Sequence, residues 1–370
     1  LHLLSRRQRQ MCIRDSYNPD GTVDPFLSCR GILMTKESAG NTEILFANPN
    51  PGDYGAIDRW SIPRSVPGAG SYGVTQSLVD AFFMENGLSP ILGYENNDYS
   101  KPIINPASGY TETGFSTEPE VRNTGWQECQ GNVNPGQVTM AGAYNMYCHR
   151  EARFYIAVLY NRAWFSKTAE GGRQTMFLKG EQDGGISMDA PRNGYLQNKL
   201  AHPDRDNVNV TFPYRPAVNY RLAEAYLNYA EALNECDPGN PDIMKYVNLI
   251  RVRAGIPEYG TGAGMITEPQ GQEEVRQSIY KERRVELCCE SSIRYMDIRR
   301  LKIGEEILNR DFYGMNYFGS KLSDDKNDPD AYFVRTRYQT RSFQKKNYWF
   351  PVPQSEMDIN PNLVQNPFWK

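Results

Sequence analysis

Residues 219–236 read NYRLAEAYLNYAEALNEC, and this stretch decides the fold. Its apolar residues recur three and four positions apart, which places them on one face of an amphipathic helix. They are Leu222, Tyr226, Tyr229, Ala230 and Leu233. Pro238 and Gly239 follow at once and predict where this helix ends.

A second helix is predicted over residues 241–255, which read PDIMKYVNLIRVRAG. Pro241 stands at an early helical position, where its missing N–H loses no hydrogen bond, and Asp242 adds a negative charge to the first turn. Gly255 and Pro257 predict its end. Two antiparallel helices within roughly 34 residues match the period of a tetratricopeptide-type hairpin, which needs neighbouring helices to bury its apolar face.

A second helical pair is predicted over residues 272–290 and 293–309, with a polar turn at Ser291-Ser292. Three glutamates repeat every four positions, and basic residues lie within a turn or two of them. The glutamates are Glu282, Glu286 and Glu290; the basic residues are Arg276, Lys281, Arg283, Arg284, Arg294, Arg299 and Arg300. This pattern favours a structural network of ion pairs on packed helices.

The same pattern permits a second interpretation, in which Glu282 and Glu286 are the paired carboxylates of a glycoside hydrolase. On a helix these positions lie near the separation of about 5 Å that retaining glycosidases use. The many adjacent guanidinium groups disfavour catalysis, because they would hold both carboxylates ionised and leave no proton donor.

Several segments together resemble the SusD/RagB family. In order along the chain they are YRLAEAYLNYAEA (220–232), NLIRVRAG (248–255), ERR (282–284), RYMD (294–297) and WFPVP (349–353), followed by Glu356, Asn360-Pro361 and Gln365-Asn366-Pro367. Weaker matches upstream are EILF (43–46), TQSLVDAF (75–82) and REARF (150–154). Two places depart from the family pattern: Glu151-Ala152 replaces the usual Asp-Pro, and Ser291-Ser292-Ile293 replaces a short glycine-containing turn.

The resemblance implies a mainly α fold: a tetratricopeptide-like superhelix of helical hairpins with a large loop-rich, irregular subdomain. It implies a surface lipoprotein of the outer membrane of Bacteroidetes-type bacteria that captures nutrient, usually oligosaccharide, and does not cleave it. Its implied partner is a TonB-dependent, SusC-like transporter, over which such proteins sit as a lid. Family members are longer, with further helices before the strand at Glu43, a secretory signal and a lipidated cysteine, so we expect this chain to be an N-terminally truncated fragment.

Composition and expected secondary structure divide the chain into four parts. Residues 1–16 are basic and Gln-rich without the apolar run of a secretory signal, and we expect a non-native or artefactual leader. Residues 17–215 are expected to form a loop-rich, ligand-facing region with a few helices and short strands. Residues 216–309 are the predicted tetratricopeptide-like scaffold, and residues 310–370 an irregular C-terminal segment that packs on it.

Composition excludes several functions. The 370 residues carry a formal net charge of −3 with no basic block, which argues against nucleic acid as a partner. The seven cysteines show neither a metal-binding spacing nor a disulfide framework; most are expected to be small buried hydrophobes, and no bond is expected between Cys288 and Cys289. Neither His149 nor His202 lies in a zinc or nucleophile motif, so no metal, no cofactor and no catalytic residue is predicted.

The predicted ligand site lies in the loops. Sugars present apolar C–H faces framed by hydroxyls, so a glycan site combines flat aromatic rings with planar polar side chains. Candidate groups with this mixture are Trp126 with Tyr110, Arg122 and Asn123; Tyr94, Asn97, Asp98 and Tyr99; and Trp60 beside Asp58 and Arg59. The competing interpretation of each ring is a loop aromatic packed on the scaffold. Three further tryptophans lie in motif-like segments and are predicted to be core: Trp164, Trp349 and Trp369.

Two functions of different classes remain open. The first is a nutrient-capturing glycan-binding protein of a surface uptake complex. The alternative is a scaffold that docks to the transporter and takes a peptide, another non-sugar ligand or none. Glycoside hydrolysis is a disfavoured third.

Overall fold

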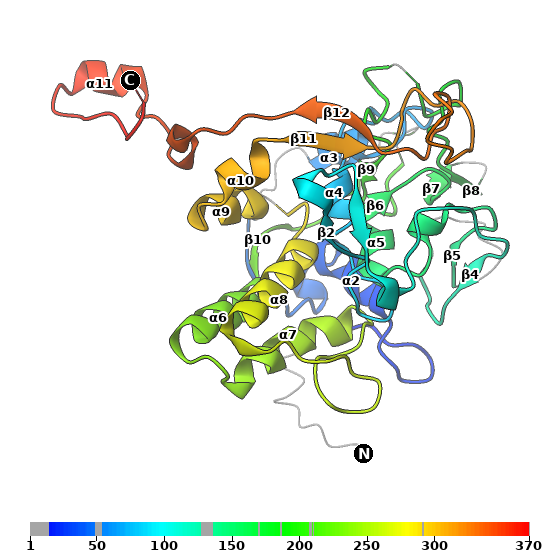
Figure 1. Cartoon of the computed structure of the whole chain (residues 1–370), viewed down its shortest axis with the longest axis horizontal. Helices are drawn as coiled ribbons and strands as arrows, with labels where there is room; N and C mark the ends of the chain where they lie inside the picture. The colour runs from blue at the N-terminus through cyan, green and yellow to red at the C-terminus, as the bar shows by residue number, and fades with distance from the viewer. Residues whose placement is uncertain are drawn as a thin grey trace.

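The computed structural model describes residues 15–48, 54–126, 136–168, 171–185, 187–206, 209, 211–290 and 292–369. Most of the predicted leader, residues 1–14, lies outside them, as do Cys12, Cys129 and Ser291. The fold is mainly helical, as expected, with small two-stranded sheets (Figure 1). In the described part of the chain, no helix is both long and apolar enough to cross a membrane.

The α-helices are α2 (Pro25–Met34), α3 (Tyr54–Ser61), α4 (Gln76–Val79), α5 (Ala152–Ala157), α6 (Leu222–Cys236), α7 (Pro241–Arg253), α8 (Gly271–Glu286), α9 (Ile293–Arg300), α10 (Gly304–Leu308) and α11 (Gln354–Ile359). The strands pair antiparallel, and the pairs are β1 (Ile44–Asn48) with β10 (Ala217–Arg221), β2 (Ile91–Tyr94) with β3 (Pro102–Ile104), β4 (Glu120–Val121) with β5 (Gln137–Thr139), β6 (Val158–Leu159) with β9 (Leu196–Gln197), β7 (Trp164–Thr168) with β8 (Gly171–Gln174), and β11 (Asp311–Gly314) with β12 (Thr336–Thr340).

Helices α6 and α7 confirm the predicted helical hairpin, and both pack on α8 (Figure 1). They share an apolar core of Ala223, Tyr226, Leu227, Ala230, Ile243, Met244, Val247, Ile250, Val275, Ile279 and Leu287. Asn240 caps α7 by accepting the Asp242 N–H at 3.0 Å. Helix α6 begins at Leu222 and not at Asn219, because the ladder with β1 keeps residues 217–221 extended. The tetratricopeptide-like superhelix stays a prediction.

The second predicted pair is shorter than the sequence indicated. Helix α8 ends at Glu286, so Cys288 and Cys289 lie in the following turn, where Cys289 takes a left-handed φ of 61°. Both thiols are free, as predicted. The helix expected over residues 293–309 is instead two helices. Lys302 separates them with a φ of 55°, and the Ile303 N–H donates to the Ile298 carbonyl, as in a Schellman closure.

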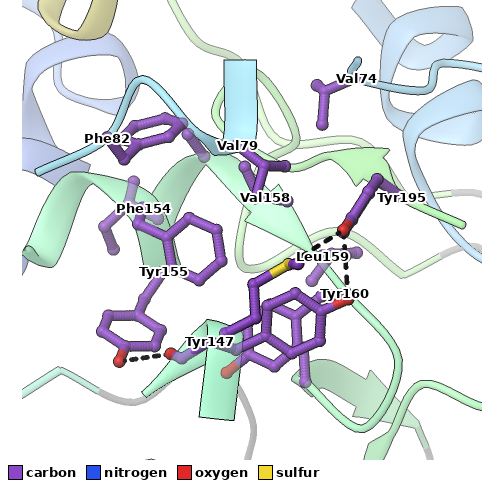
Figure 2. Packing of buried hydrophobic residues seen from close by; sticks show 14 of the residues in the cluster. Val74, Val79, Phe82, Tyr147, Phe154, Tyr155, Val158, Leu159, Tyr160 and Tyr195 are labelled. Carbon is purple, nitrogen blue, oxygen red and sulfur yellow. Dashed lines mark hydrogen bonds between the residues drawn. The ribbon is translucent and has the colours of Figure 1, made fainter. Parts of the chain in front are cut away.

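The loop-rich region is held by a core of aromatic side chains (Figure 2). Helix α5 is buried along its whole length, and Phe154 stacks on Tyr160 with ring centroids 5.4 Å apart. Several buried tyrosine hydroxyls have hydrogen-bond partners: Tyr195 donates to Gln76 Oε1 at 2.7 Å, and Tyr155 to the Tyr147 carbonyl at 2.8 Å. Large rings with satisfied polar ends allow irregular segments to bury enough apolar surface.

The first half of the C-terminal part packs on the body of the protein, and the second half extends away from it. The Arg335 side chain, next to β12, is only 6% exposed and pairs with Asp80 at 2.7 Å. Beyond residue 344 the chain runs away from the body to α11 (Figure 1). Trp349 is 39% exposed there, so its predicted place in a core is wrong; the segment passes beyond the residues that could cover it. Trp164 and Trp369 are only partly buried.

Candidate functional site

The α8 glutamates lie in a buried ion-pair network, as the charge pattern predicted. Glu286 accepts from Arg153 at 3.0 Å and Arg221 at 2.8 Å, and also from Arg253. The other pairs are Glu282 with Arg153 and Arg251, Glu290 with Arg221 and Lys199, and Glu43 with Arg221 and Arg253. The network therefore joins α5, β1, β10 and α7 to α8.

The basic residues of α8 and α9 pair with other carboxylates than the nearby α8 glutamates that the sequence spacing suggested. Arg276 pairs with Glu235, Arg283 with Asp297 at 2.7 Å, and Arg300 with Glu231 at 2.6 Å. The guanidinium groups that reach the α8 glutamates come from elsewhere, because only the inward face of α8 meets the rest of the scaffold.

The network keeps Glu286 ionised. Burial alone would raise its pKa, but the charges of Arg253, Arg221, Arg153 and Lys199 together hold the pKa of this carboxyl well below its usual value. Glu282 is fully buried and shared between two guanidinium groups. Glu286, held ionised in this way, has no proton to donate to a leaving group.

The structure does not gather the Trp126 group on one surface. Trp126 is 5% exposed and stacks on Phe26 with centroids 5.3 Å apart. Tyr110 is equally buried, donates to Glu112 at 2.7 Å and lies under the Arg150 guanidinium. Both rings sit in the larger core, as the competing interpretation expects, so neither offers a ring face to a ligand in this structure.

The two polar members of that group lie nearer the surface. Arg122 is largely buried between Glu85, at 2.8 Å, and Glu120. Asn123 is exposed and donates to Asp20 Oδ2 at 3.0 Å. Among the described residues, Glu85 and Glu120 also form the one group with metal-ligand spacing, together with His149. Arg122 already neutralises both carboxylates, which disfavours a cation there.

The second candidate group stays together, in the connection between β2 and β3. Tyr94 stacks on Tyr99 with centroids 4.0 Å apart and donates its hydroxyl to Asp80 at 2.7 Å. Asn97 is exposed with a φ of 60°, a conformation that asparagine tolerates, and Asp98 accepts from the backbone and hydroxyl of Ser100.

Trp60 is 41% exposed on α3 and contacts Tyr72 edge to face. Its neighbour Asp58 is buried and pairs with Arg215 at 2.8 Å. Trp60 thus keeps an accessible ring, supported by a second aromatic ring.

The sequence did not predict a hollow of about 780 Å³ between α9 and the chain that follows β12. Its walls combine an aromatic ring, amides and guanidinium groups; among them are Arg294, Tyr295, Gln339, Arg341, Phe343 and Asn347. This volume lies within the range of small-molecule sites, about 300–1,000 Å³. Arg294, Tyr295 and Asn347 lie in or beside the RYMD and WFPVP segments, but no spacing rule brings segments so far apart together.

The β2–β3 aromatics lie beside this hollow. The Arg310 guanidinium stacks over Tyr99, 4.4 Å from its centroid. The carbonyl of the same Arg310 accepts the backbone N–H of Arg341, which lines the hollow. Tyr99 is also close enough to influence the charge of Arg294. Arg310 therefore connects the predicted Tyr94–Tyr99 group to the hollow, although neither tyrosine is among the described residues that line it.

The protein thus combines a mainly helical fold with a pocket lined by polar and aromatic side chains. A family model described as the SusD family matches residues 38–369, and the chain therefore belongs to this family. The SusD-like protein P2 of Formosa agariphila is 33% identical over 146 residues, which are 40% of this chain and 24% of that protein.

Solved structures agree with the family. A SusD-like protein of Bacteroides fragilis matches with a TM-score of 0.64 at 25% identity, over 94% of this chain and 57% of that one. A second B. fragilis protein, described as a SusD-like carbohydrate binding protein, matches with a TM-score of 0.62 at 20% identity, over 94% and 58%. The chain thus spans less than two thirds of these relatives.

Proposed function

We propose that this protein captures glycan as the surface component of a TonB-dependent oligosaccharide uptake complex, without cleaving it. The observation that carries the proposal is the hollow between α9 and β12. Its lining combines the ring of Tyr295, which is 38% exposed, with the amides of Gln339 and Asn347, and a sugar ring and its hydroxyls require such a combination. Membership of the SusD family supports the same function.

The proposed location is the outer membrane and the proposed partner a SusC-like transporter. Both follow from what the family resemblance implies. The proposal also includes Tyr94, Asn97, Asp98 and Tyr99 as ligand contacts on the side of the pocket near Arg310, with Trp60 as a separate contact.

Binding without hydrolysis is supported by the state of the α8 carboxylates. Glu282 and Glu286 are buried and engaged by arginines, and the pKa of Glu286 is held well below its usual value against the effect of burial. A retaining glycosidase needs one of its two carboxyls protonated.

A transporter-docking scaffold with a peptide or no ligand is the second candidate. The observation that favours it is the exposed apolar surface of the C-terminal segment, where Phe350 is 63% exposed and Val364 84%. Exposed apolar patches of this kind mark protein contacts.

Titration calorimetry against a panel of plant and host oligosaccharides tests the proposal, with Tyr295→Ala and Tyr99→Ala beside the unmodified chain. Tyr229→Ala is the matched control, because Tyr229 is 46% exposed on α6, away from the pocket. We expect Tyr295→Ala to weaken binding about tenfold or more, since stacked aromatics carry much of the binding energy in such sites.

Two outcomes would contradict this function. Absence of binding to every glycan, with binding to peptides or transporter intact, would favour the docking scaffold. New reducing ends released from a bound glycan would revive the hydrolase interpretation.

A further inference from the structure

In the part of the chain that the structure describes, the arginines around the pocket lack the carboxylate partners that several other arginine side chains have. Arg153, Arg221, Arg253 and Arg335 each pair with at least one carboxylate. Within the described ranges, four arginines at or beside the pocket form no ion pair; they are Arg284, Arg294, Arg310 and Arg341. A low-dielectric protein region seldom collects positive charge without a counter-charge.

Three of the four make only neutral contacts. Arg284 donates to the carbonyl of Ser77 at 2.7 Å. Arg310 lies over Tyr99, and its buried Nε has no acceptor within the described structure. Arg341 donates to Gln339 at 3.0 Å and stacks on Phe312. Of these three, Arg341 lines the pocket, so its remaining N–H donors are available to a ligand there.

Of the four arginines, Arg294 has the fewest interactions that offset the cost of burying its positive charge. No hydrogen bond to its guanidinium is found among the residues that the structure describes, although it lies on the pocket wall. Burial, reinforced by the nearby charge of Arg284, lowers its pKa to about 10, and the more distant Asp297 and Tyr99 oppose this shift only partly. An anion in the pocket would offset the free-energy cost of keeping the buried Arg294 guanidinium charged.

The carboxylates nearest to the pocket are already neutralised. Glu290, which lines it, is held by Arg221 at 2.7 Å and Lys199 at 2.6 Å. Asp297 is held by Arg283 and Arg300. The pocket thus presents uncompensated positive charge on its walls.

Resting on the proposed glycan binding, we propose that this pocket takes an anionic glycan, with Arg294 and Arg341 binding a carboxylate or sulfate group on the sugar. A guanidinium matches the planar carboxylate and the sulfate oxygens with two parallel N–H donors. Gln339 and Asn347 contact the neighbouring hydroxyls, and Tyr295 the sugar face. Arg284 and Arg310 add a positive field that favours binding at low salt.

The test compares matched glycan pairs by titration calorimetry on the whole chain: oligogalacturonate against its carboxyl-reduced form, and a carrageenan oligosaccharide against its desulfated form. We expect the anionic member of at least one pair to bind about tenfold or more tightly, with the difference shrinking as salt rises. The pair that responds distinguishes a uronic acid from a sulfate ester.

Variants locate the effect. Arg294→Gln and Arg341→Gln should each abolish most of the preference for the anionic member. Arg337→Gln is the matched control: it removes the same charge from β12, where Arg337 is exposed and already pairs with Asp311 at 3.3 Å. It should keep the full preference.

The outcomes separate the two proposals. Equal binding of charged and neutral members, or a preference that both pocket variants retain, overturns the anionic ligand but leaves glycan capture standing. Absence of binding to all four glycans and to the wider panel overturns both. Because Arg341 is exposed, and because the paired glycans need no variant, a folding defect in Arg294→Gln does not prevent the decision.

Discussion

At the scale of single residues, Arg221 shows how this chain holds buried charge. It stands at the last position of β10, and its guanidinium reaches Glu43, Glu286 and Glu290 at 2.5, 2.8 and 2.7 Å. Carboxylates from two distant parts of the chain thus share this cation, and each has a further positive partner: Arg253 for Glu43 and Glu286, and Lys199 for Glu290. Such an arrangement contributes specificity of packing more than net stability, because desolvation offsets much of the attraction.

Arg221→Ala should therefore lower the free energy of unfolding by about 3–5 kcal/mol, since it leaves three buried carboxylates with one positive partner fewer than the folded state needs to balance their charge. Chemical denaturation measures this. Arg276→Ala is the control: Arg276 pairs with Glu235 at the surface, and its loss should leave the midpoint nearly unchanged. Similar losses in the two variants would contradict the role given to the network.

His202 gives the stability a dependence on pH. It is buried, and burial, with the charges of Arg30, Arg215 and Arg205, lowers its pKa from 6.5 to about 4 against the opposing Asp204. Between pH 6.5 and about pH 4, His202 is protonated in the unfolded chain but stays neutral in the folded chain. Stability is therefore expected to fall as pH drops through this window, by up to about 3 kcal/mol.

The variant His202→Asn tests this dependence. Its amide oxygen can still accept the Asp204 N–H that His202 Nδ1 accepts at 3.1 Å, but it does not titrate. Denaturation curves from pH 7 to pH 4 should show a shallower decline for the variant. Parallel declines would show that other groups, such as Glu286, dominate the acid response.

At the scale of elements, the sequence predicted most where local chemistry decides. Apolar spacing in residues 219–236, Pro241 and Gly255 predicted α6 and α7, because their signals lie within each helix. The end of α8 was missed, since its turn contains Cys289, a residue with no preference for positive φ. The split between α9 and α10 at Lys302 was missed for the same reason.

The candidate site was harder to predict. Tyr94 and Tyr99 were found because they are close in sequence and carry the chemistry of sugar binding. Trp126 was chosen by the same reasoning but is buried against Phe26, a contact between distant residues that no local pattern encodes. The pocket escaped prediction because Arg294 and Arg341 meet only through tertiary packing.

Substitution of Gly255 tests how tightly the end of α7 packs against the start of α2. This glycine follows α7 with a φ of 70°, and a Cβ there would lie 2.7 Å from the Pro25 ring at the start of α2. Gly255→Ala should cost about 2 kcal/mol or more, from left-handed strain plus the clash with α2. Gly109→Ala is matched, because its φ is 73° with open space around the new methyl group. Equal losses of unfolding free energy would mean that α2 gives way without cost.

At the scale of the whole molecule, the C-terminal segment has two parts that differ in how strongly they are held to the body. Up to residue 350 the chain is tied to the body: the Tyr348 carbonyl accepts from Arg299 at 2.6 Å, and Arg299 stacks on Phe350. Beyond it, the described residues bond to one another, as between Val352 and Gln365 at 2.8 Å, and reach back only as far as Lys346, whose carbonyl accepts from Trp369 Nε1 at 2.9 Å. Figure 1 shows the same separation, with α11 far from the helical scaffold.

Removal of residues 351–370 should therefore leave the unfolding transition of the body nearly unchanged, because little surface is buried between the two parts. Removal of residues 335–370 should destabilise strongly, by about 3 kcal/mol or more, since it leaves buried Asp80 without Arg335 and unpairs β11. Calorimetric melting of both truncations measures the difference. If the shorter deletion already lowers Tm by many degrees, the segment stabilises the body through contacts that its extended course does not contain. If it leaves Tm in place, the exposed apolar side chains of the segment are free to serve binding.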